Sequence, residues 1–443
     1  MSLWFYGYFN VRYLLIILAS ILVNYIVYRN MSRTMRYKKL IFACGLVFDI
    51  GLLLYYKYMD FFISNINAAF STDFNLLHIV LPLGISFFTF QQISFIVDAY
   101  KGEVPEYRIL DYACYVTFFP QLIAGPIVTH DELITQFRQL EKKKLNWDNM
   151  SRGIYIFVLG LSKKVIIADA FGAAVDTYFA QMENWNIAIA ICMMFSYTFE
   201  IYFDFSGYCD MAIGLGKMLN IDLPVNFNSP YKATSIGEFW DRWHMTLTRF
   251  LTRYIYIPLG GNRKGKLRTY VNIMIVFLVS GLWHGANWTF VLWGLLHGLL
   301  DVIEKIMGQA FTRINKGIRW GVTFLLVNLA WVLFRVDSIS DVGLFARACT
   351  KLQMISVKDG FWSNYCPYEI DQIVAVTGWS VLPFLCVIVL FVLAFYFACI
   401  SKNAYEKMQQ FQPNWRNMLA CICLLLYCIS DLSKISTFLY FNF

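Results

Sequence analysis

Residues 379–400 read WSVLPFLCVIVLFVLAFYFACI, a run of 22 positions without a single charged side chain. An α-helix rises by about 1.5 Å per residue, and the hydrocarbon core of a bilayer is about 30 Å thick. A helix made from this run is therefore long enough and apolar enough to cross a membrane.

Nine other runs of similar character predict nine further membrane-spanning segments. They are residues 11–28, 40–56, 76–97, 154–171, 185–205, 270–283, 288–303, 318–334 and 418–429. Residues 110–128 are nearly as apolar, but Pro120, Gly125 and Pro126 interrupt them, so a broken or re-entrant segment buried in protein is expected there. The sequence thus predicts an all-α polytopic membrane protein, with residues 1–443 forming a single membrane domain.

The overall composition favours the same class. Of the 443 residues, 58% are hydrophobic and 15% are charged, whereas soluble domains average about 25% charged residues. The net charge is +8, and the basic residues cluster beside apolar runs, which indicates anionic lipids rather than nucleic acid as their partners. The eleven cysteines contain no CxxC pair and are expected to be small buried hydrophobic residues, so a disulfide scaffold is excluded.

Lysine and arginine are unevenly distributed among the loops. Residues 29–39, 138–144, 242–268 and 305–319 are rich in them, whereas residues 57–75 and 176–184 are poor. The positive-inside rule places the rich loops in the cytoplasm and the N-terminus outside, with residues 11–28 as an uncleaved anchor. This orientation makes residues 270–303 cross the membrane twice, so two short or tilted helices are expected there.

Residues 235–254 show the periodicity of one amphipathic helix. Phe239, Trp243 and Leu247 recur at four-residue steps. Ser235 followed by Glu238 supplies a capping-box start. We expect this helix to lie along the cytoplasmic boundary of the membrane.

Two of the five histidines stand in unusual surroundings. His244 and His284 each adjoin tryptophan and lie in or beside apolar sequence, and His297 is an intermediate case. Polar side chains are costly at such depth, so a functional role is the first hypothesis for them. Residues 281–285 and 294–298 form GxxxG patterns around two of these histidines, and close packing of two helices is the alternative explanation.

Two other groups of charged residues are candidates for function. Glu200 and Asp204 stand one helical turn apart at the end of an apolar run, where they could transfer protons or couple to an ion, or only bond to neighbouring helices. Arg263, Lys264 and Lys266 lie in the glycine-rich stretch GGNRKGKL, residues 260–267. This stretch lacks the Ser or Thr of a phosphate loop, so it predicts binding of a diphosphate or an acidic carrier by charge, or of lipid headgroups.

Several long motifs resemble one known family. They are PLGISFFTFQQISFIVDAYKG (82–102), FFPQLIAGPI (118–127), YFDFSGYCDMAIGLGKMLNIDLPVNFNSPY (202–231), EFWDRWHMTLTRFLTRYIYIPLGGNRKG (238–265), SGLWHGANWTFVLWGLLHG (280–298) and FLYFNF (438–443). These stretches resemble the membrane-bound O-acyltransferases, and among them the bacterial alginate O-acetyltransferase branch, which decorates extracellular polysaccharides or peptidoglycan. The resemblance covers roughly residues 1–335 and the last six residues, and leaves residues 345–412 without a match.

This resemblance implies a fold and a set of site residues. The expected fold is a ring of about ten to eleven transmembrane helices, some short or re-entrant, around a central tunnel, with a catalytic core at about 76–335 and C-terminal helices with an aromatic tail at 379–443. His284, in the WHG motif, is expected to be the general base, and His244 to orient the donor or stabilise charge. The residues expected to line or support the tunnel are Trp243, Trp283, Asn287, His297, Glu200 and Asp204, and those expected to bind the donor are Arg263, Lys264 and Lys266.

The resemblance also implies a reaction. We expect transfer of an acetyl group from cytoplasmic acetyl-CoA, a donor substrate and not a tightly bound cofactor, across the cytoplasmic membrane of a bacterium. The acceptor is expected to be an extracellular polysaccharide or peptidoglycan, served through an extracytoplasmic SGNH/GDSL-type or esterase-like acetyltransferase. Tyr440 is a candidate acyl relay, with an interfacial aromatic anchor as the alternative, and no metal is expected.

Two alternative functions remain open at the level of sequence. The first keeps the fold and transfers D-alanine from a carrier protein to teichoic acid. The second is a transporter or polysaccharide exporter with Glu200, Asp204 and the broken segment near Pro120 as its site. Transporters commonly show inverted repeats, and the sequence shows none.

Overall fold

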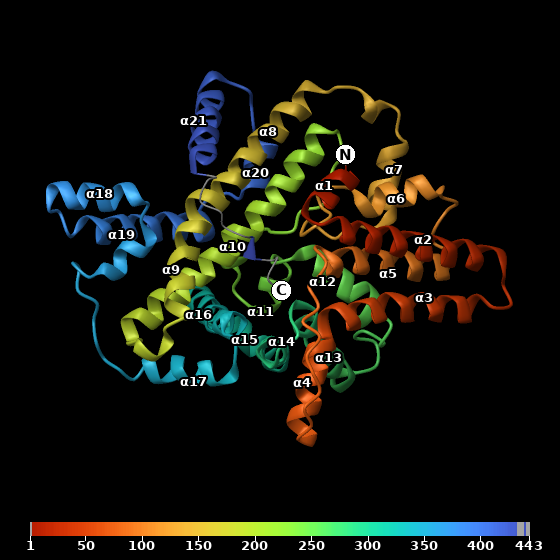
Figure 1. The fold of residues 1–443 in the computed structure, drawn as a ribbon, viewed down its shortest axis with the longest axis horizontal. Coiled ribbons are helices and arrows are strands. Elements are labelled where there is room, and N and C mark those ends of the chain that lie inside the picture. Colours follow the sequence, from red (N-terminus) through yellow and green to blue (C-terminus); the bar gives the residue numbers. More distant parts are fainter. Residues whose placement is uncertain (1, 432–437, 440–443) are drawn as a thin grey trace. The chain divides into compact units, whose positions relative to one another are not determined.

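The structure is a computed structural model that describes residues 2–431, 438 and 439. Every regular element in this part of the chain is helical, from α1 (Ser2–Phe9) to α21 (Trp415–Asp431) (Figure 1). Among the described residues, six helical stretches are long and apolar enough to cross a membrane: α2 (Val11–Arg33), Lys38–Phe70, α10 (Ile187–Met218), α13 (Lys266–His284), α16 (Lys316–Arg335) and Leu382–Ile400. The prediction of an all-α, multi-pass membrane protein is confirmed.

Of the other four predicted spans, three are helical throughout; the fourth, residues 76–97, is helical only from Ile85 onward, so the prediction is wrong for residues 76–84, which are irregular. Both α5 (Ile85–Lys101) and α21 have 17 residues. Helix α14 (Trp288–Met307) ends with three charged residues, Asp301, Glu304 and Lys305. The remaining helices are α6 (Ile109–Thr117), α7 (His130–Arg138), α8 (Trp147–Ser162), α9 (Asp169–Phe179), α11 (Ile236–Trp240), α12 (Met245–Leu251), α15 (Gln309–Arg313), α17 (Ile339–Ala348), α18 (Tyr368–Thr377), α19 (Leu382–Phe395) and α20 (Ala404–Gln409).

One loop expected from the sequence is a helix. Residues 57–75 are poor in basic residues and were expected to connect two spans, but helix α3 (Lys38–Leu53) continues through a π-helical turn into α4 (Met59–Phe70). Its apolar residues Phe62 and Ile66 recur at helical spacing, a pattern that the count of basic residues alone does not detect. The helix ends at Ser71, which has a positive φ of 52°.

The broken segment predicted at residues 110–128 is confirmed. Helix α6 ends at Thr117, and the following backbone is irregular up to Thr129 although its side chains are buried. The segment passes so close to the start of α5 that a Cβ at Gly84 would lie 2.8 Å from the carbonyl oxygen of Leu122. Gly84 also has a φ of +69°, so both conformation and space require glycine there.

The described chain forms two compact units whose segments alternate along the sequence. One unit comprises Met1–Ile154, Ala212–Val225 and Thr246–Leu259, and the other comprises Tyr155–Met211, Asn226–Met245 and Gly260–Phe443. His244, His284 and His297 all belong to the second unit.

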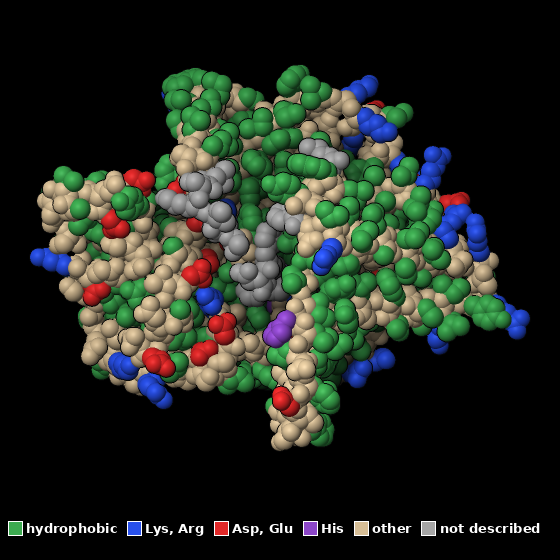
Figure 2. All heavy atoms as spheres, viewed as in Figure 1, with side chains coloured by type: hydrophobic (Ala, Val, Ile, Leu, Met, Phe, Trp, Pro, Cys, Tyr) green, Lys and Arg blue, Asp and Glu red, His purple; other side chains and the backbone are tan. Residues whose placement is uncertain are grey.

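The first unit is built around helices α2, α3 and α5, which lie side by side (Figure 1). Buried polar pairs join them: Asn24 donates a 2.7 Å hydrogen bond to Asp49, and Gln92 donates a 2.9 Å hydrogen bond to Ser20. Figure 2 shows hydrophobic side chains covering the outer face of α2 and α3 and Lys and Arg side chains at the end where the two helices are joined. This surface suits contact with lipid chains and anionic headgroups.

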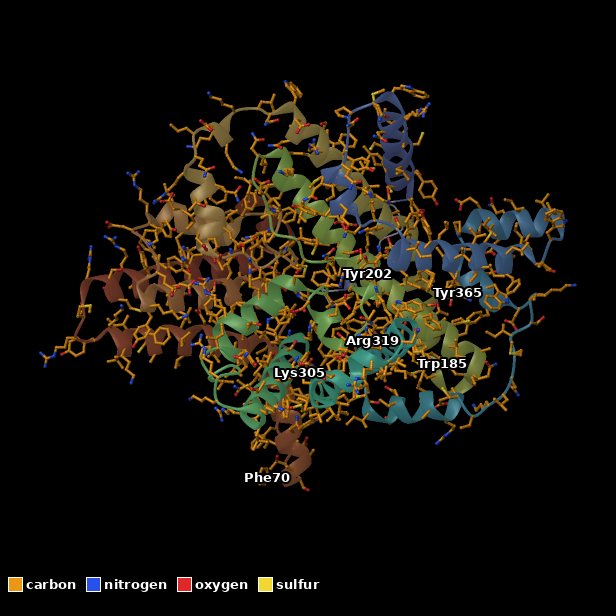
Figure 3. All side chains as sticks on the ribbon, turned by 180° about the vertical axis from the view of Figure 1, so that it is seen from behind. Phe70, Trp185, Tyr202, Lys305, Arg319 and Tyr365 are labelled. Carbon is orange, nitrogen blue, oxygen red and sulfur yellow. The ribbon has the colours of Figure 1, made fainter. Side chains whose placement is uncertain are left out.

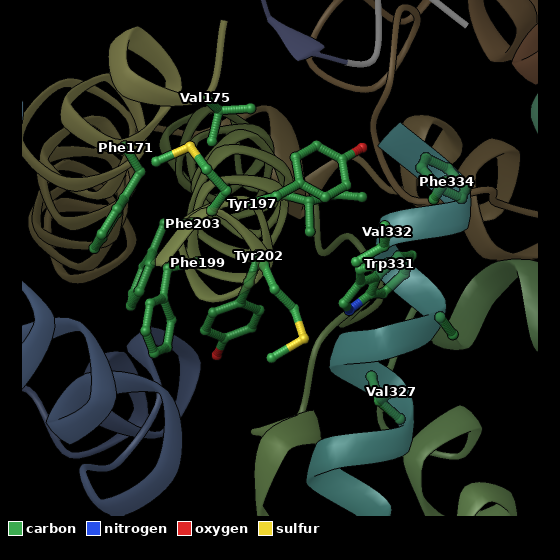
Figure 4. Packing of buried hydrophobic residues seen from close by; sticks show 14 of the residues in the cluster. Phe171, Val175, Tyr197, Phe199, Tyr202, Phe203, Val327, Trp331, Val332 and Phe334 are labelled. Atoms are coloured by element: carbon green, nitrogen blue, oxygen red, sulfur yellow. The ribbon is translucent and has the colours of Figure 1, made fainter. Parts of the chain in front are cut away.

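The second unit is filled by aromatic side chains. Figure 4 shows part of this core, with Phe199 and Phe203 from α10 and Trp331 and Phe334 from α16. Tyr202 and Tyr365, labelled in Figure 3, also belong to it. This packed interior surrounds the three histidines and fixes their positions.

Candidate active site

His284 is the last residue of α13, and the chain turns directly after it into α14. Its side chain is 2% exposed. The rings of Trp283, Trp293 and Phe334, from α13, α14 and α16, lie 4.9, 5.1 and 5.0 Å from its ring, centroid to centroid. Three helices therefore hold this imidazole in an aromatic enclosure.

Glycine residues allow the turn between α13 and α14 to be this tight. A Cβ at Gly281 would collide with the carbonyl oxygen of Phe290 and lie 3.3 Å from the Cα of Gly294. A Cβ at Gly294 would in turn lie 3.2 Å from the Cα of Gly281. The close helix packing predicted from the two GxxxG patterns is confirmed, and it places His284 beside Trp293.

His244 interrupts the helix that was expected over residues 235–254, and that prediction is wrong in this respect. Helix α11 ends at Trp240, α12 begins at Met245, and His244 between them has a φ of +45°. Two backbone hydrogen bonds hold this conformation: Asn228 N–H donates to Arg242, and Met245 N–H donates to Asn226. A positive φ is uncommon outside glycine, and such strained residues cluster at functional sites.

Asn226 also fixes the side chain of His244. The Nδ1 atom of His244 lies 3.2 Å from Oδ1 of Asn226, while Nδ2 of Asn226 donates a 3.4 Å hydrogen bond to the sulfur of Cys209. The amide oxygen therefore faces the imidazole, an arrangement that matches the tautomer with its hydrogen on Nδ1 and its lone pair on Nε2. Burial lowers the pKa of His244 to about 3, so this imidazole is neutral at physiological pH.

His244 and His284 share one enclosure. Their ring centroids are 6.4 Å apart, and Trp283 lies 5.8 Å from His244 and 4.9 Å from His284. Phe205 of α10 packs against the other side of His244 at 4.8 Å. The structure thus brings together the two histidines that the sequence singled out.

His297 lies one ring further into the aromatic core. Trp293 contacts both histidines, with its centroid 5.1 Å from that of His284 and 4.9 Å from that of His297. The indole N–H of Trp240 donates a 3.3 Å hydrogen bond to Nδ1 of His297, and Phe239 stacks on the same imidazole. These contacts make His297 a packing partner of the enclosure.

Two other expected site residues have contacts of a structural kind. Trp243 is buried and packs against Trp331 at 4.9 Å and Phe239 at 5.6 Å. Asn287 caps α14 by accepting a hydrogen bond from Thr289 N–H, and donates one to the carbonyl oxygen of Asp337. Both residues support the elements that carry the histidines.

The charged candidates lie in other places. Asp204 of α10 forms a 2.6 Å ion pair with Lys164, and Glu200, one turn earlier, is buried beside Gly172. Arg263 and Lys264 are exposed in the turn before α13, Lys266 is the exposed first residue of that helix, and His284 is its last residue. The 18 residue steps from Lys266 to His284 correspond to roughly 27 Å at about 1.5 Å per residue, so a donor that contacts both must be extended.

Some residues of the enclosure were not predicted, and one predicted site residue lies outside the part of the chain that the structure describes. Asn226, Phe205, Trp293 and Phe334 contact the histidines, yet only their occurrence within or near the family-like motifs could have indicated them. Tyr440 lies outside the described residues.

Comparison with known proteins bears directly on this arrangement. The model of the MBOAT family, membrane-bound O-acyltransferase, matches residues 103–336, which include both histidines. A peptidoglycan O-acetyltransferase of Helicobacter pylori is 40% identical over 100% of this chain and 90% of its own length. A probable alginate O-acetylase AlgI of Pseudomonas aeruginosa is 40% identical over 76% of this chain and 65% of its own length. A teichoic acid D-alanyltransferase of Bacillus subtilis is 28% identical over 54% of this chain and 61% of its own length.

These matches extend over the enclosure of His244 and His284 as well as over the membrane helices around it. The chain is therefore an enzyme of the acyltransferase class and belongs to the membrane-bound O-acyltransferase family.

Proposed function

We propose that the protein transfers an acetyl group from acetyl-CoA to a hydroxyl group of peptidoglycan or of another extracellular polysaccharide. The name of the Helicobacter pylori relative and its match over the whole chain support acetyl as the cargo. The D-alanyltransferase relative matches only about half of the chain and at lower identity, which makes D-alanyl transfer the second candidate. Membership of an acyltransferase family favours both over a transporter.

The observation that carries this proposal is the pairing of His244 and His284 inside a buried aromatic enclosure. His284 takes the proton from the acceptor hydroxyl while the oxygen attacks the thioester carbonyl carbon. The carbon–sulfur bond then breaks, and the protonated imidazole returns the proton to the thiolate, so the charges balance. A low-dielectric enclosure strengthens the interactions that stabilise the charges formed on the way.

The tautomer of His244 distinguishes between the two roles expected for it. Because Nδ1 holds the hydrogen that faces Asn226, Nε2 is a hydrogen-bond acceptor. A neutral acceptor cannot stabilise an oxyanion, but it can bind an N–H or O–H group of a substrate. We therefore assign His244 the role of orienting the acyl donor or the acceptor hydroxyl through a hydrogen bond to Nε2.

The remaining parts of the proposal concern the two sides of the membrane. Arg263, Lys264 and Lys266 bind the phosphates of acetyl-CoA on the cytoplasmic side, supported by their exposure in one turn. The N-terminus lies outside a bacterial cytoplasmic membrane, and an extracytoplasmic SGNH/GDSL-type partner completes transfer to the polymer. Tyr440 relays the acetyl group, and full polymer acetylation by Tyr440→Phe would contradict that step.

The test is acetyl transfer by the purified protein in nanodiscs, supplied with radiolabelled acetyl-CoA, the extracytoplasmic SGNH/GDSL-type partner, and either peptidoglycan fragments or a soluble polysaccharide. A parallel reaction supplies D-alanyl carrier protein with teichoic acid. The proposal predicts label in the glycan from acetyl-CoA. Turnover of the D-alanyl carrier alone would replace acetyl by D-alanine as the cargo.

A further inference from the structure

A buried acid–base cluster joins η3 (Lys163–Ala168), α9 and α10 in the second unit. The Nζ atom of Lys164 lies 2.6 Å from Oδ1 of Asp204 and 2.7 Å from Oδ1 of Asp169. The side chains of Lys164 and Asp204 are 7% and 2% exposed. One ammonium group thus faces two carboxylates in a place that excludes most water.

Two residues near the end of the chain contact both members of the buried ion pair. Leu439 N–H donates a 3.1 Å hydrogen bond to Oδ2 of Asp204. The ring of Phe438 lies 4.8 Å from Nζ of Lys164 and packs edge-on against Tyr208 at 5.3 Å. We refer to residues 438–439 as the tail.

These contacts suit a docking site better than chance packing. A buried carboxylate needs donors for both oxygens, and the tail supplies the backbone N–H that the second oxygen of Asp204 accepts. A buried ammonium group is stabilised by the face of an aromatic ring, which Phe438 supplies. Leu439 also lines, with Lys164 and Glu200, a cavity of about 540 Å³, so the docked tail forms part of a wall.

We propose that Lys164 and Asp204 form a docking site for the tail and thereby hold it in place during acyl transfer. Tyr440, the candidate acyl relay, follows Leu439 directly in the sequence. Lys164 and Asp204 are positioning residues in this scheme, because they act through the tail. The consequence for acyl transfer rests on the proposed function, whereas docking itself does not.

The chain contains a matched control. Lys163, the preceding residue, forms a 2.5 Å ion pair with Asp210, one and a half turns further along α10. In the described chain its other contacts are Ser206 and the ring of Tyr202. The double variants Lys164→Met/Asp204→Leu and Lys163→Met/Asp210→Leu therefore each remove one ion pair between η3 and α10. The first also removes the Lys164–Asp169 pair and the contacts to the tail. The single variant Asp169→Asn, which keeps Lys164 and Asp204, separates these two losses.

Hydrogen exchange of the full chain in nanodiscs, followed by mass spectrometry of peptides that contain Leu439, measures docking. The Lys164/Asp204 variant is expected to exchange this amide about tenfold faster or more, the change expected for loss of a charged hydrogen bond. The Lys163/Asp210 variant is expected to keep the wild-type rate, and Lys164→Arg, which retains the charge over Phe438, is expected to stay close to it. An unchanged rate in the first variant, or an equal rise in the control, would overturn docking.

Acetyl transfer measured on the same preparations tests the positioning role. The Lys164/Asp204 variant is expected to lose kcat about tenfold while KM for acetyl-CoA stays constant, and Lys164→Arg is expected to retain kcat. Faster exchange with an unchanged kcat would overturn the positioning role. Faster exchange in the Lys164/Asp204 variant, together with no acetyl transfer by wild type, would confirm docking and overturn the proposed function instead.

Discussion

The imidazole rings of His244 and His284 lie 6.4 Å apart, although 40 positions separate the two residues in the chain. Trp283 contacts both rings, and both side chains are almost completely buried. Ionisable side chains buried at such depth in a membrane protein point to function, so this pair is the centre of the candidate active site.

Replacement of Asn226 by Ala is expected to lower kcat about fivefold to tenfold, since a neutral hydrogen bond contributes about 1 kcal/mol. The variant removes the amide oxygen that accepts the hydrogen bond from Nδ1–H of His244. Without this bond, nothing in the proposed scheme keeps the lone pair on Nε2. In a His244→Ala background the same substitution is expected to cost nothing further, which a double-mutant cycle of kcat measures. Additive losses would mean that Asn226 does not act through His244.

Gly281→Ala is expected to lower the thermal unfolding temperature strongly or to prevent folding. The added Cβ would collide with the carbonyl oxygen of Phe290 in α14, and backbone cannot move away cheaply. Gly321→Ala in α16 is the control, because no atom lies within 4 Å of the added group. That change is expected to be neutral or to stabilise by up to about 1 kcal/mol, as alanine favours helix. Equal unfolding temperatures for the two variants would contradict the close packing of α13 and α14.

His244 is expected to make the protein less stable in acid. Burial lowers its pKa from 6.5 to about 3, so between these values the unfolded chain binds a proton that the folded chain does not. The free energy of unfolding therefore falls as pH drops below 6.5, by about 2 kcal/mol between pH 7.5 and pH 5 at 1.36 kcal/mol per unit. Unfolding temperatures of wild type and His244→Gln across this range check it. A variant that loses as much stability as the wild type would show that His244 is not responsible.

Neutralisation of Arg263, Lys264 and Lys266 to Gln is expected to raise KM for acetyl-CoA by more than tenfold at low salt and to leave kcat nearly unchanged. These residues lie at the opposite end of α13 from His284 and would attract phosphate groups by charge. Neutralisation of Arg33, Arg36 and Lys39, which are equally exposed where α2 ends and α3 begins, is the control. If both triple variants raise KM equally, general surface charge explains the effect and the loop has no specific role.

Much of the fold was predictable because length and lack of charge suffice to mark a membrane helix. Residues 379–400 became a helix over Leu382–Ile400, and the prolines near Pro120 correctly indicated a broken segment. The extension of α3 to Phe70 was not predicted, because the low content of basic residues in 57–75 indicates a loop, whereas the spacing of Phe62 and Ile66 indicates a helix.

The site was predictable only in part. Tryptophan neighbours and glycine spacing led to His244 and His284, but the break at His244 depends on backbone hydrogen bonds with Asn226, which accepts, and Asn228, which donates, about 16 to 18 residues earlier. The docking of Phe438 and Leu439 on Lys164 and Asp204 joins segments more than 230 positions apart. Tertiary contacts of this range leave no local pattern in a single sequence.

The most direct test is the release of labelled acetyl from acetyl-CoA by the purified protein in nanodiscs, with wild type and His284→Ala measured side by side with a glycan acceptor. Wild type is expected to turn over acetyl-CoA, and a His284→Ala protein that remains folded is expected to lose about 10²- to 10⁴-fold of this activity, because the general base is gone. Undiminished acetyl transfer by the folded variant would contradict the central claim that His284 performs the chemistry.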